Sequence, residues 1–155
     1  MSGGAIAGTL GAMTIEVRVR RLRANAQMPA RSPAHATGLD LHACLDAPLT
    51  LARSPQRVPT GIAIEFPAGH DVQVRPRSGL SSKGVMVAFG TVDADYRGEL
   101  LVTMWTVGDL DGYELQHGDR IAQLIVATLA PAVVVEVAEL SPTVRGDGGH
   151  GSTGR

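Results

Sequence analysis

The sequence of 155 residues predicts an all-β protein that folds as one domain. Three observations support this prediction. Short apolar runs alternate with polar residues at a period of two, glycine and proline clusters separate these runs, and no stretch beyond a turn or two has the spacing of an amphipathic helix. Short strands separated by turn signals are typical of a sandwich, a jelly roll or a barrel.

Apolar and β-branched residues define the expected strands in chain order. The first runs alternate strictly, as in Ile-Glu-Val-Arg-Val at 15–19 and Ile-Ala-Ile-Glu-Phe at 62–66. Prolines and glycines between the runs mark the turns. We expect strands over residues 15–19, 62–66, 72–74, 85–89, 100–107, 121–129 and 133–140.

Composition narrows the class of protein. Only two Phe, two Tyr and one Trp are present, so one subunit has few bulky side chains for a core and association of subunits would help. The net charge is −1 and no basic tract occurs, which argues against direct contact with nucleic acid. Cys44 is the only cysteine, so an intrachain disulfide and a cysteine zinc site are excluded, and a reducing, cytoplasmic location fits.

The two ends differ from the middle of the chain. Residues 1–13 are small and apolar, lack a positive start and are broken by glycines, so we expect a mobile extension, or an alternative start at Met13, and no signal peptide or membrane span. Residues 145–155 contain nothing apolar to bury. The expected organisation is one β domain over residues 1–144 and a flexible, glycine-rich C-terminal arm over 145–155.

Two segments in the first half of the chain have the composition of an anion site. The first, at 37–43, places Asp40 between two leucines so that it faces away from the core, although a solvated Asp is the simpler interpretation. The second, at 75–84, contains Arg77, Ser78 and Gly79. Small residues let backbone N–H groups approach an anion and Arg is a bidentate phosphate donor, but a polar loop has the same composition.

Two further segments follow in the second half. Residues 90–99 contain Asp93 and Asp95, which lie on one side of an extended chain, and then Tyr96; a charged hairpin turn is the alternative interpretation. The segment at 118–124 opens with a Gly-Asp turn. Gln123 is two residues after Ile121, so the two side chains point to opposite faces of the strand only if the strand bulges. Taken alone, Gln123 is equally well an ordinary edge residue.

The fifth segment is the arm. Residues 149–154 formally match the dinucleotide fingerprint G-x-G-x-x-G, which needs a strand before it and a helix after it. Only Arg155 follows, so the fingerprint interpretation fails. A run of glycines, hydroxyls and arginine can still wrap a polyphosphate and become ordered on binding.

In this order the five segments resemble the five motifs of the trimeric dUTPase family, from about residue 37 onward. The stretches that carry the resemblance most closely lie at 76–80, 93–99, 118–123 and 145–154. The resemblance implies a jelly-roll-like distorted barrel that assembles as a homotrimer. It also implies active sites between subunits and a C-terminal arm exchanged with a neighbour.

The implied activity is hydrolysis of dUTP to dUMP and pyrophosphate, which keeps uracil out of DNA and supplies dUMP for thymidylate synthesis. Asp93 matches the carboxylate that deprotonates the water attacking the α-phosphorus. Mg²⁺ is expected on the triphosphate, held mainly by phosphate oxygens and waters rather than by a cage of protein ligands. Asp40 and Gln123 match residues that act in the outer shell of this metal.

The remaining implied roles concern the substrate. Tyr96 matches the aromatic residue under the deoxyribose, where a 2′-hydroxyl would clash, and a hairpin over residues 87–93 would read uracil through main-chain groups. The residues implied to bind phosphates are Arg77, Ser78, Gly79, Gln123, Arg145, Ser152 and Thr153. Those implied to bind uracil or deoxyribose are Val87, Gly90, Thr91, Val92, Asp93, Tyr96 and His150.

Two positions depart from the pattern of the family. Val87 stands where many bacterial members have Asn, which removes a side-chain contact with uracil but leaves the backbone contacts. His150 stands where the arm usually has a stacking Phe. An imidazole can also stack on uracil, and its charge would make closure of the arm pH-sensitive below neutrality.

Two alternatives stay open at this point. dCTP deaminase shares the fold, but it needs a Glu near the base and a different third motif, whereas Tyr96-Arg97-Gly98 and the terminal phosphate clamp favour a dUTPase. A bifunctional enzyme that also releases ammonia from dCTP is not excluded. A non-catalytic, nucleotide-gated binding module is disfavoured, because every residue assigned to catalysis is present.

Overall fold

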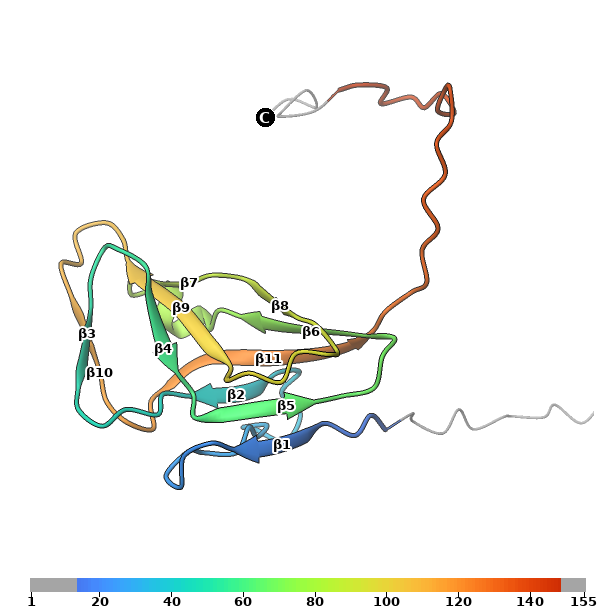
Figure 1. Ribbon diagram of the computed structural model, residues 1–155. Coiled ribbons are helices and arrows are strands. Elements are labelled where there is room, and N and C mark those ends of the chain that lie inside the picture. Colours follow the sequence, from blue (N-terminus) through green and yellow to red (C-terminus); the bar gives the residue numbers. More distant parts are fainter. Residues whose placement is uncertain (1–13, 149–155) are drawn as a thin grey trace, which may run out of the picture.

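The computed structural model describes residues 14–148, and β-strands dominate this part of the chain (Figure 1). Its elements are, in order, β1 (Arg18–Arg21), β2 (Leu39–His42), β3 (Leu49–Leu51), β4 (Gln56–Pro59), β5 (Ile62–Glu65), β6 (His70–Arg75), α1 (Ser78–Ser81), β7 (Val85–Val87), β8 (Gly90–Val92), β9 (Leu101–Thr106), β10 (Tyr113–Leu115) and β11 (Arg120–Thr128). Within residues 14–148, no helix has the length and apolarity needed to cross a membrane. The predicted all-β fold is confirmed.

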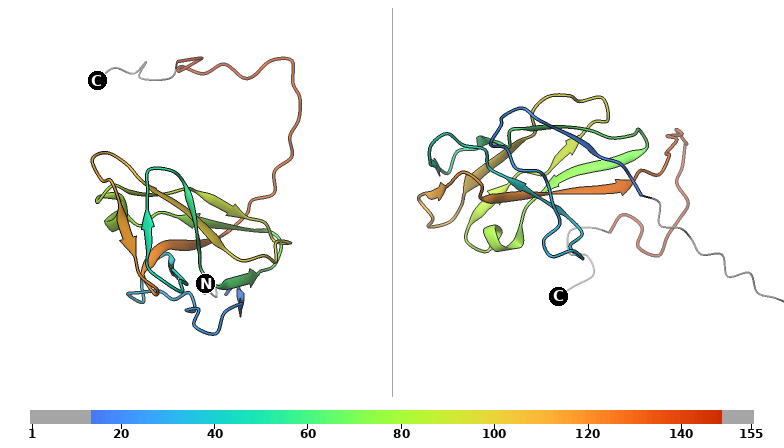
Figure 2. Two further views of the ribbon diagram at one scale, coloured as in Figure 1. Left: turned by 60° about the vertical axis from the view of Figure 1, so that its left-hand side comes forward. Right: turned by 90° about the horizontal axis from the view of Figure 1, so that it is seen from below.

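The strands form two larger sheets and two smaller, two-stranded ones. One large sheet has the order β2-β11-β6-β8 and the other β4-β9-β7, while β1 pairs with β5 and β10 with β3. Figures 1 and 2 show that these sheets wrap around a common interior, as in a distorted barrel. Strands distant in sequence are neighbours, since β2 and β6 both pair with β11. Such connections are typical of jelly-roll-like topologies.

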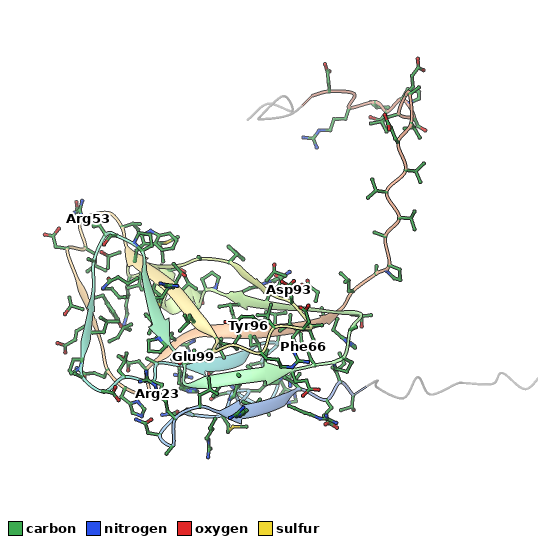
Figure 3. The ribbon with its side chains drawn as sticks, in the orientation of Figure 1. Arg23, Arg53, Phe66, Asp93, Tyr96 and Glu99 are labelled. Carbon is green, nitrogen blue, oxygen red and sulfur yellow. The ribbon has the colours of Figure 1, made fainter. Side chains whose placement is uncertain are left out.

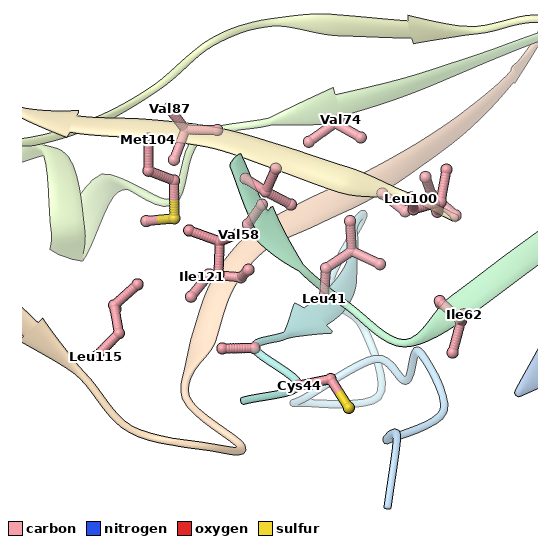
Figure 4. Close-up of a cluster of buried hydrophobic side chains, with 14 of the residues drawn as sticks. Leu41, Cys44, Val58, Ile62, Val74, Val87, Leu100, Met104, Leu115 and Ile121 are labelled. Carbon is pink, nitrogen blue, oxygen red and sulfur yellow. The ribbon is translucent and has the colours of Figure 1, made fainter. Parts of the chain in front are cut away.

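Aliphatic side chains fill the interior of the barrel (Figure 4). Leu41, Val58 and Ile121, from β2, β4 and β11, are almost completely buried. Phe66 is the one aromatic residue among the buried core side chains of the described part of the chain. Because a close-packed interior keeps a cavity when a large side chain is truncated, a Leu→Ala change at such a position costs about 2–5 kcal/mol.

Most of the predicted strands are confirmed by the pairing. The runs at 62–66 and 100–107 contain β5 and β9, and the run at 121–129 contains most of β11. Sequence reasoning missed the strands of three or four residues, because so few positions show no clear alternation. The missed strands are β3, β4, β8 and β10.

The run at 133–140 is the exception, and the strand predicted there is wrong for the isolated chain. Regular structure ends with β11, and the chain then leaves the sheets as an extended segment (Figure 1). Val133 is 88% exposed and Val134 is 97% exposed. A strand is stabilised by hydrogen bonds to a neighbouring strand, and within residues 14–148 no strand pairs with this segment. The valines of this run are therefore left without a covering strand within the described residues.

Candidate active site

Strand β6 separates two groups of polar side chains that come from the motif segments. The pairing of β6 with β8 brings Asp93 to the first end of β6. The pairing of β6 with β11 brings Gln123 to the last end, where Arg77 follows shortly after the strand. Val92, next to Asp93, pairs with Val72, and Gln123 pairs with Arg75, so three to four steps of about 3.3 Å along β6 separate the two groups by roughly 10–13 Å. One chain therefore carries two separate groups of polar side chains, which we call half-sites.

The half-site at the last end of β6 is an arginine cradle, formed by Asp40, Arg77, Arg120 and Gln123. Asp40 is only 9% exposed and its carboxylate faces both guanidinium groups. Its Oδ1 lies 3.2 Å from Nε of Arg77, and its Oδ2 lies 3.3 Å from Nη1 of Arg120. Nη1 of Arg77 also donates to the carbonyl of Arg120 at 3.1 Å. One buried carboxylate thus aligns two partly exposed guanidinium groups, which have further N–H groups to offer an anion.

Gln123 enters the cradle because β11 is bulged. The pairing of β11 with β2 shifts register between Arg120 and Ala122, so Gln123 turns away from the core while Ala122 stays buried. The sequence left open whether the strand bulges here, and the pairing shows that it does. Nε2 of Gln123 donates to the carbonyl of Pro76 at 2.9 Å. The side chain also packs over Gly38, where an added Cβ would lie 2.9 Å from Cβ of Gln123. Gln123 therefore fixes the backbone that leads into α1.

Helix α1 holds the rest of the predicted phosphate loop. The N–H groups of Leu80 and Ser81 donate to the carbonyl of Arg77, which closes a single turn. Leu80 is buried and anchors this turn to the core. Ser78 and Gly79 remain exposed next to Arg77. Small exposed residues beside aligned guanidinium groups suit an anionic ligand.

Burial affects the electrostatics at the edge of the cradle. His42 ends β2, and its Nδ1 is buried without a hydrogen-bond partner in the described part of the chain. Burial lowers the pKa of His42, while the nearby Asp40 carboxylate acts in the opposite direction. The charges of Arg120 and Arg77 also lower it. A neutral imidazole is therefore favoured beside the two guanidinium groups.

The half-site at the first end of β6 is the tyrosine pocket, a cavity of about 250 Å³. It is lined by Val74, Ala88, Phe89, Gly90, Thr91, Val92, Asp93, Tyr96, Glu99, Leu100, Leu101 and Thr103. Asp93 and Tyr96 are the ends of one turn, since the N–H of Tyr96 donates to the carbonyl of Asp93 at 3.0 Å. Both residues are exposed, and Figure 3 labels them. An exposed carboxylate beside an aromatic ring can activate a water next to a bound molecule.

The structure corrects the hairpin predicted over residues 87–93. Val87 is 3% exposed within the core and does not line the tyrosine pocket. Strand β7 pairs with β9 and β8 pairs with β6, so the chain crosses from one sheet to the other here. The apolar Val87 side chain turns inward at this corner of the barrel, so only its main chain remains available to a ligand. Gly90, Thr91 and Val92 line the pocket.

In the described part of the arm, residues 145–148, no residue lines the tyrosine pocket or contacts the side chains of the arginine cradle. Arg145 is exposed, and its Nε donates to the carbonyl of Gly148 at 2.8 Å within its own segment. The chain that carries it leads away from the sheets (Figure 1). The other predicted arm residues, His150, Ser152 and Thr153, lie outside the described residues.

Sequence reasoning missed Arg120 and Glu99 as site residues. Both lie inside motif segments, but their partners are distant in sequence. Arg120 contacts Asp40, which is 80 positions earlier, and Oε1 of Glu99 accepts a hydrogen bond from the N–H of Gly61, which is 38 positions earlier. Each is a charged residue inside a motif segment, and no role had been assigned to it. That was the signal that could have identified both residues.

The fold and the two half-sites define the chain as a nucleotide-binding enzyme of the all-β class. A family model described as dUTPase matches residues 24–154. The deoxyuridine 5′-triphosphate nucleotidohydrolase of Syntrophotalea carbinolica is 46% identical over 145 residues, which cover 91% of this chain and 98% of that protein. The chain therefore belongs to the dUTPase family.

Solved structures of phage dUTPases share the fold. A variant of the Staphylococcus bacteriophage 80alpha dUTPase with dUpNHpp aligns with a TM-score of 0.78 at 25% identity, over 90% of this chain and 99% of that chain. A variant dUTPase from phage phi11 of S. aureus, described with a structural Mg(II) ion, aligns with a TM-score of 0.70 at 24% identity, over 80% of this chain and 97% of that chain. The similarity to these structures agrees with the barrel seen here.

Proposed function

We propose that this member of the dUTPase family hydrolyses dUTP to dUMP and pyrophosphate, with a water attacking the α-phosphorus. The observation that carries the proposal is the turn that joins the exposed Asp93 to Tyr96 at the mouth of a cavity of about 250 Å³. Asp93 acts as the general base that orients and deprotonates the water. The proposal is also supported by the relative that is named a deoxyuridine 5′-triphosphate nucleotidohydrolase and by the phage enzyme with dUpNHpp.

The tyrosine pocket selects the nucleoside. Tyr96 packs under the deoxyribose, where the 2′-hydroxyl of a ribonucleotide would clash. The main chain of residues 90–92 reads uracil, opposes the donor–acceptor pattern of cytosine and leaves no room for the methyl group of thymine. Since Val87 is buried, its side chain takes no part and the selectivity rests on the backbone.

The arginine cradle binds the phosphates. Arg77 supplies a planar donor that Asp40 already aligns, and Ser78 and Gly79 present a hydroxyl and backbone N–H groups next to it. Gln123 supports this loop through its hydrogen bond to Pro76. A guanidinium that is aligned before the ligand arrives loses less side-chain entropy on binding.

Mg²⁺ accompanies the triphosphate in this mechanism, and the donor set of the cradle fits only a supporting role for the protein. Both carboxylate oxygens of Asp40 face guanidinium groups, so Asp40 and Gln123 would contact the metal through its waters. When bound, the ion neutralises phosphate charge and holds the triphosphate in a reactive shape. The phi11 relative described with a structural Mg(II) ion supports a role for magnesium in the family.

The complete active site lies between subunits of a homotrimer. Asp93 and the cradle must both meet one triphosphate, yet in one chain they lie near opposite ends of β6, roughly 10–13 Å apart along the strand. A second copy of the chain supplies the missing half, because a closed symmetric assembly repeats the same contact at every interface. Each site therefore takes its tyrosine pocket from one subunit and its arginine cradle from another.

The segment from residue 129 onward is exchanged with a neighbour. Its exposed valines need an apolar surface, and each chain offers a groove of about 570 Å³ whose lining includes Val17, Val19, Leu39 and Val126. The flexible arm over residues 145–155 then closes the site. Arg145, Ser152 and Thr153 reach the terminal phosphates, and His150 stacks on uracil.

In the cell this reaction takes place in the cytoplasm. It removes dUTP from the pool that supplies DNA synthesis, so uracil stays out of DNA, and it supplies dUMP for thymidylate synthesis. A single cysteine and a net charge of −1 agree with this role as a small-molecule enzyme without a nucleic-acid partner.

The test is pyrophosphate release from dUTP, dCTP, dTTP and UTP with Mg²⁺, for the parent protein and for Asp93→Asn. We expect rapid turnover of dUTP alone, and a loss on the order of 100-fold to 10,000-fold in Asp93→Asn because the base is removed. Equal turnover of dUTP by the variant would show that Asp93 is not the base. Comparable turnover of dTTP would contradict the uracil selectivity, and ammonia released from dCTP would indicate a bifunctional deaminase.

A further inference from the structure

The ring of Tyr96 lies directly against Gly98. A Cβ added to Gly98 would lie 2.5 Å from Cζ and 2.9 Å from Cε2 of Tyr96, which is closer than real side chains approach. The phenol hydroxyl donates to the carbonyl of Glu99 at 3.0 Å. The hydroxyl end of the ring thus lies against a residue that has no side chain and donates to a main-chain acceptor.

Glu99, whose carbonyl accepts the hydrogen bond from the Tyr96 hydroxyl, is itself anchored to another part of the barrel. Oε1 of Glu99 accepts a hydrogen bond from the N–H of Gly61 at 2.7 Å. Gly61 has a φ of +69° and packs so tightly that an added Cβ would lie 2.7 Å from Sγ of Cys44. The N–H of Leu100 donates to the carbonyl of Ile62 at 2.9 Å. Two neighbouring hydrogen bonds therefore tie the end of the motif to a turn that cannot easily shift.

The turn before Gly98 is closed upon itself. The N–H of Tyr96 donates to the carbonyl of Asp93, and Nη1 of Arg97 donates to the carbonyls of Ala94 at 2.7 Å and Tyr96 at 3.0 Å. Residues 93–97 therefore move as one unit. Gly98 and Glu99 connect this unit to the barrel, so they determine the position of the Tyr96 ring.

We propose that Gly98 and Glu99 are positioning residues that hold the Tyr96 ring where it distinguishes deoxyribose from ribose. The proposal rests on the proposed function, in which Tyr96 packs under the sugar. A 2′-hydroxyl is rejected only if the ring cannot retreat, because a ring that swings aside removes the clash and still covers the sugar. Selectivity against UTP therefore depends on these two residues more strongly than turnover of dUTP does.

The main test compares Glu99→Ala with its matched control, Glu99→Gln. The measurement is the kcat/KM for dUTP divided by the kcat/KM for UTP. Gln keeps an oxygen that can accept from Gly61, so the ratio should be retained, whereas Ala should lower it roughly tenfold, which corresponds to the loss of about one hydrogen bond. A general loss of structure would lower both rates alike and would leave the ratio unchanged.

Tyr96→Phe keeps the proposal testable if Glu99→Ala folds poorly. This change at an exposed residue removes only the hydroxyl that donates to the carbonyl of Glu99. It should lower the ratio of kcat/KM for dUTP to kcat/KM for UTP by a similar factor. The double variant should lose no more than either single variant, because both changes break the same chain of contacts. Gly98→Ala should lower the ratio further, since the new methyl group displaces the ring itself.

The outcomes separate this proposal from the proposed function. A parent protein that does not hydrolyse dUTP would overturn the function. A parent that is active and selective, with folded Glu99→Ala and Tyr96→Phe variants that keep the parental ratio, would overturn the positioning role alone. Equal losses of selectivity in Glu99→Gln and Glu99→Ala would also overturn it, because the oxygen that meets Gly61 would then not matter.

Discussion

The arginine cradle and the tyrosine pocket are built in opposite ways, although one strand connects them. The cradle depends on contacts between distant parts of the chain, such as the ion pair of Arg120 with Asp40, 80 positions apart. The pocket depends on a local turn, in which the hydroxyl of Tyr96 reaches the carbonyl of Glu99 only three positions away. The acid of the cradle is buried, whereas both functional side chains of the pocket are exposed.

In the proposed function, this difference separates the affinity for phosphate from the selectivity for the nucleoside. The cradle forms only when distant segments of the chain have come together, so a change there should affect both the stability of the fold and the proposed binding of phosphate. The pocket can be altered at its surface with little effect on stability, because its side chains are largely exposed and its contacts are local. Each of the following predictions compares the two half-sites under one change.

The largest effect is expected from mixing two inactive variants. Arg77→Ala has an intact pocket and Asp93→Asn has an intact cradle, so each homotrimer should be nearly inactive. When the two chains are co-expressed and mixed trimers are purified, about one site in three should combine the intact halves and recover activity, because each mixed trimer has one interface with both intact halves. Activity no greater than the sum of the separate variants would contradict a site shared between subunits.

Removal of the cradle guanidinium should lower activity without changing selectivity. In Arg77→Ala we expect kcat/KM for dUTP to fall by roughly 100-fold, since a charge-assisted hydrogen bond to phosphate is lost. Arg77→Lys should recover only part of this loss, because an ammonium cannot bind in a bidentate way. The ratio of dUTP to UTP turnover should stay at its parental value. Arg53→Ala, which removes an exposed ion pair with Asp111 (Figure 3), is the control and should change neither quantity.

Removal of the buried Asp40 carboxylate should lower the stability of the fold more than changes in the tyrosine pocket do. Asp40→Ala leaves two guanidinium groups without their shared partner, so the free energy of unfolding should fall by roughly 1–3 kcal/mol. Asp46→Ala removes an exposed partner of Arg23 and should cost less than about 1 kcal/mol. Urea denaturation of both variants measures the difference. Equal losses would indicate that the cradle carries no more stability than a surface ion pair.

The smallest effect concerns pH. Burial lowers the pKa of His42 in the folded protein, so the unfolded chain binds a proton more readily. The contribution to stability is complete above the ordinary histidine value of 6.5 and is lost as the pH falls through the lower pKa of the folded state. His42→Gln should flatten the decline in stability below that value, while His35→Gln, at an exposed position, serves as the control. An unchanged profile in His42→Gln would contradict this assignment.

Local chemistry explains what could be predicted from the sequence. The mismatch between the polarity of Gln123 and the apolar phase of the strand allowed either a bulge or an ordinary edge residue, and the pairing shows the bulge. The grouping of Asp93 with Tyr96 followed from their closeness in sequence. The ion pairs of Asp40 and the anchoring of Glu99 could not be predicted, because they join residues whose distance depends on the whole topology.

Two positions show the limit of patterns in the same way. Val87 has its side chain in the core, as the alternation of buried and exposed residues along β7 requires, so only its main chain remains available to a ligand. The segment at 133–140 has the composition of a strand, but no strand of the described chain pairs with it. A pattern states which face is apolar, and only the fold and its partners determine what that face meets.

The extended segment after β11 is not needed to pair the strands of the barrel. All of these strand pairs lie within residues 18–128, so a subunit can fold before the segment meets a partner. The twenty residues at 129–148 can span at most about 70 Å, whereas a barrel of this size has a radius of gyration of about 13 Å. If the segment is exchanged as proposed, it is long enough to cross a neighbour, and dilution should delay the appearance of activity without delaying the folding of each chain.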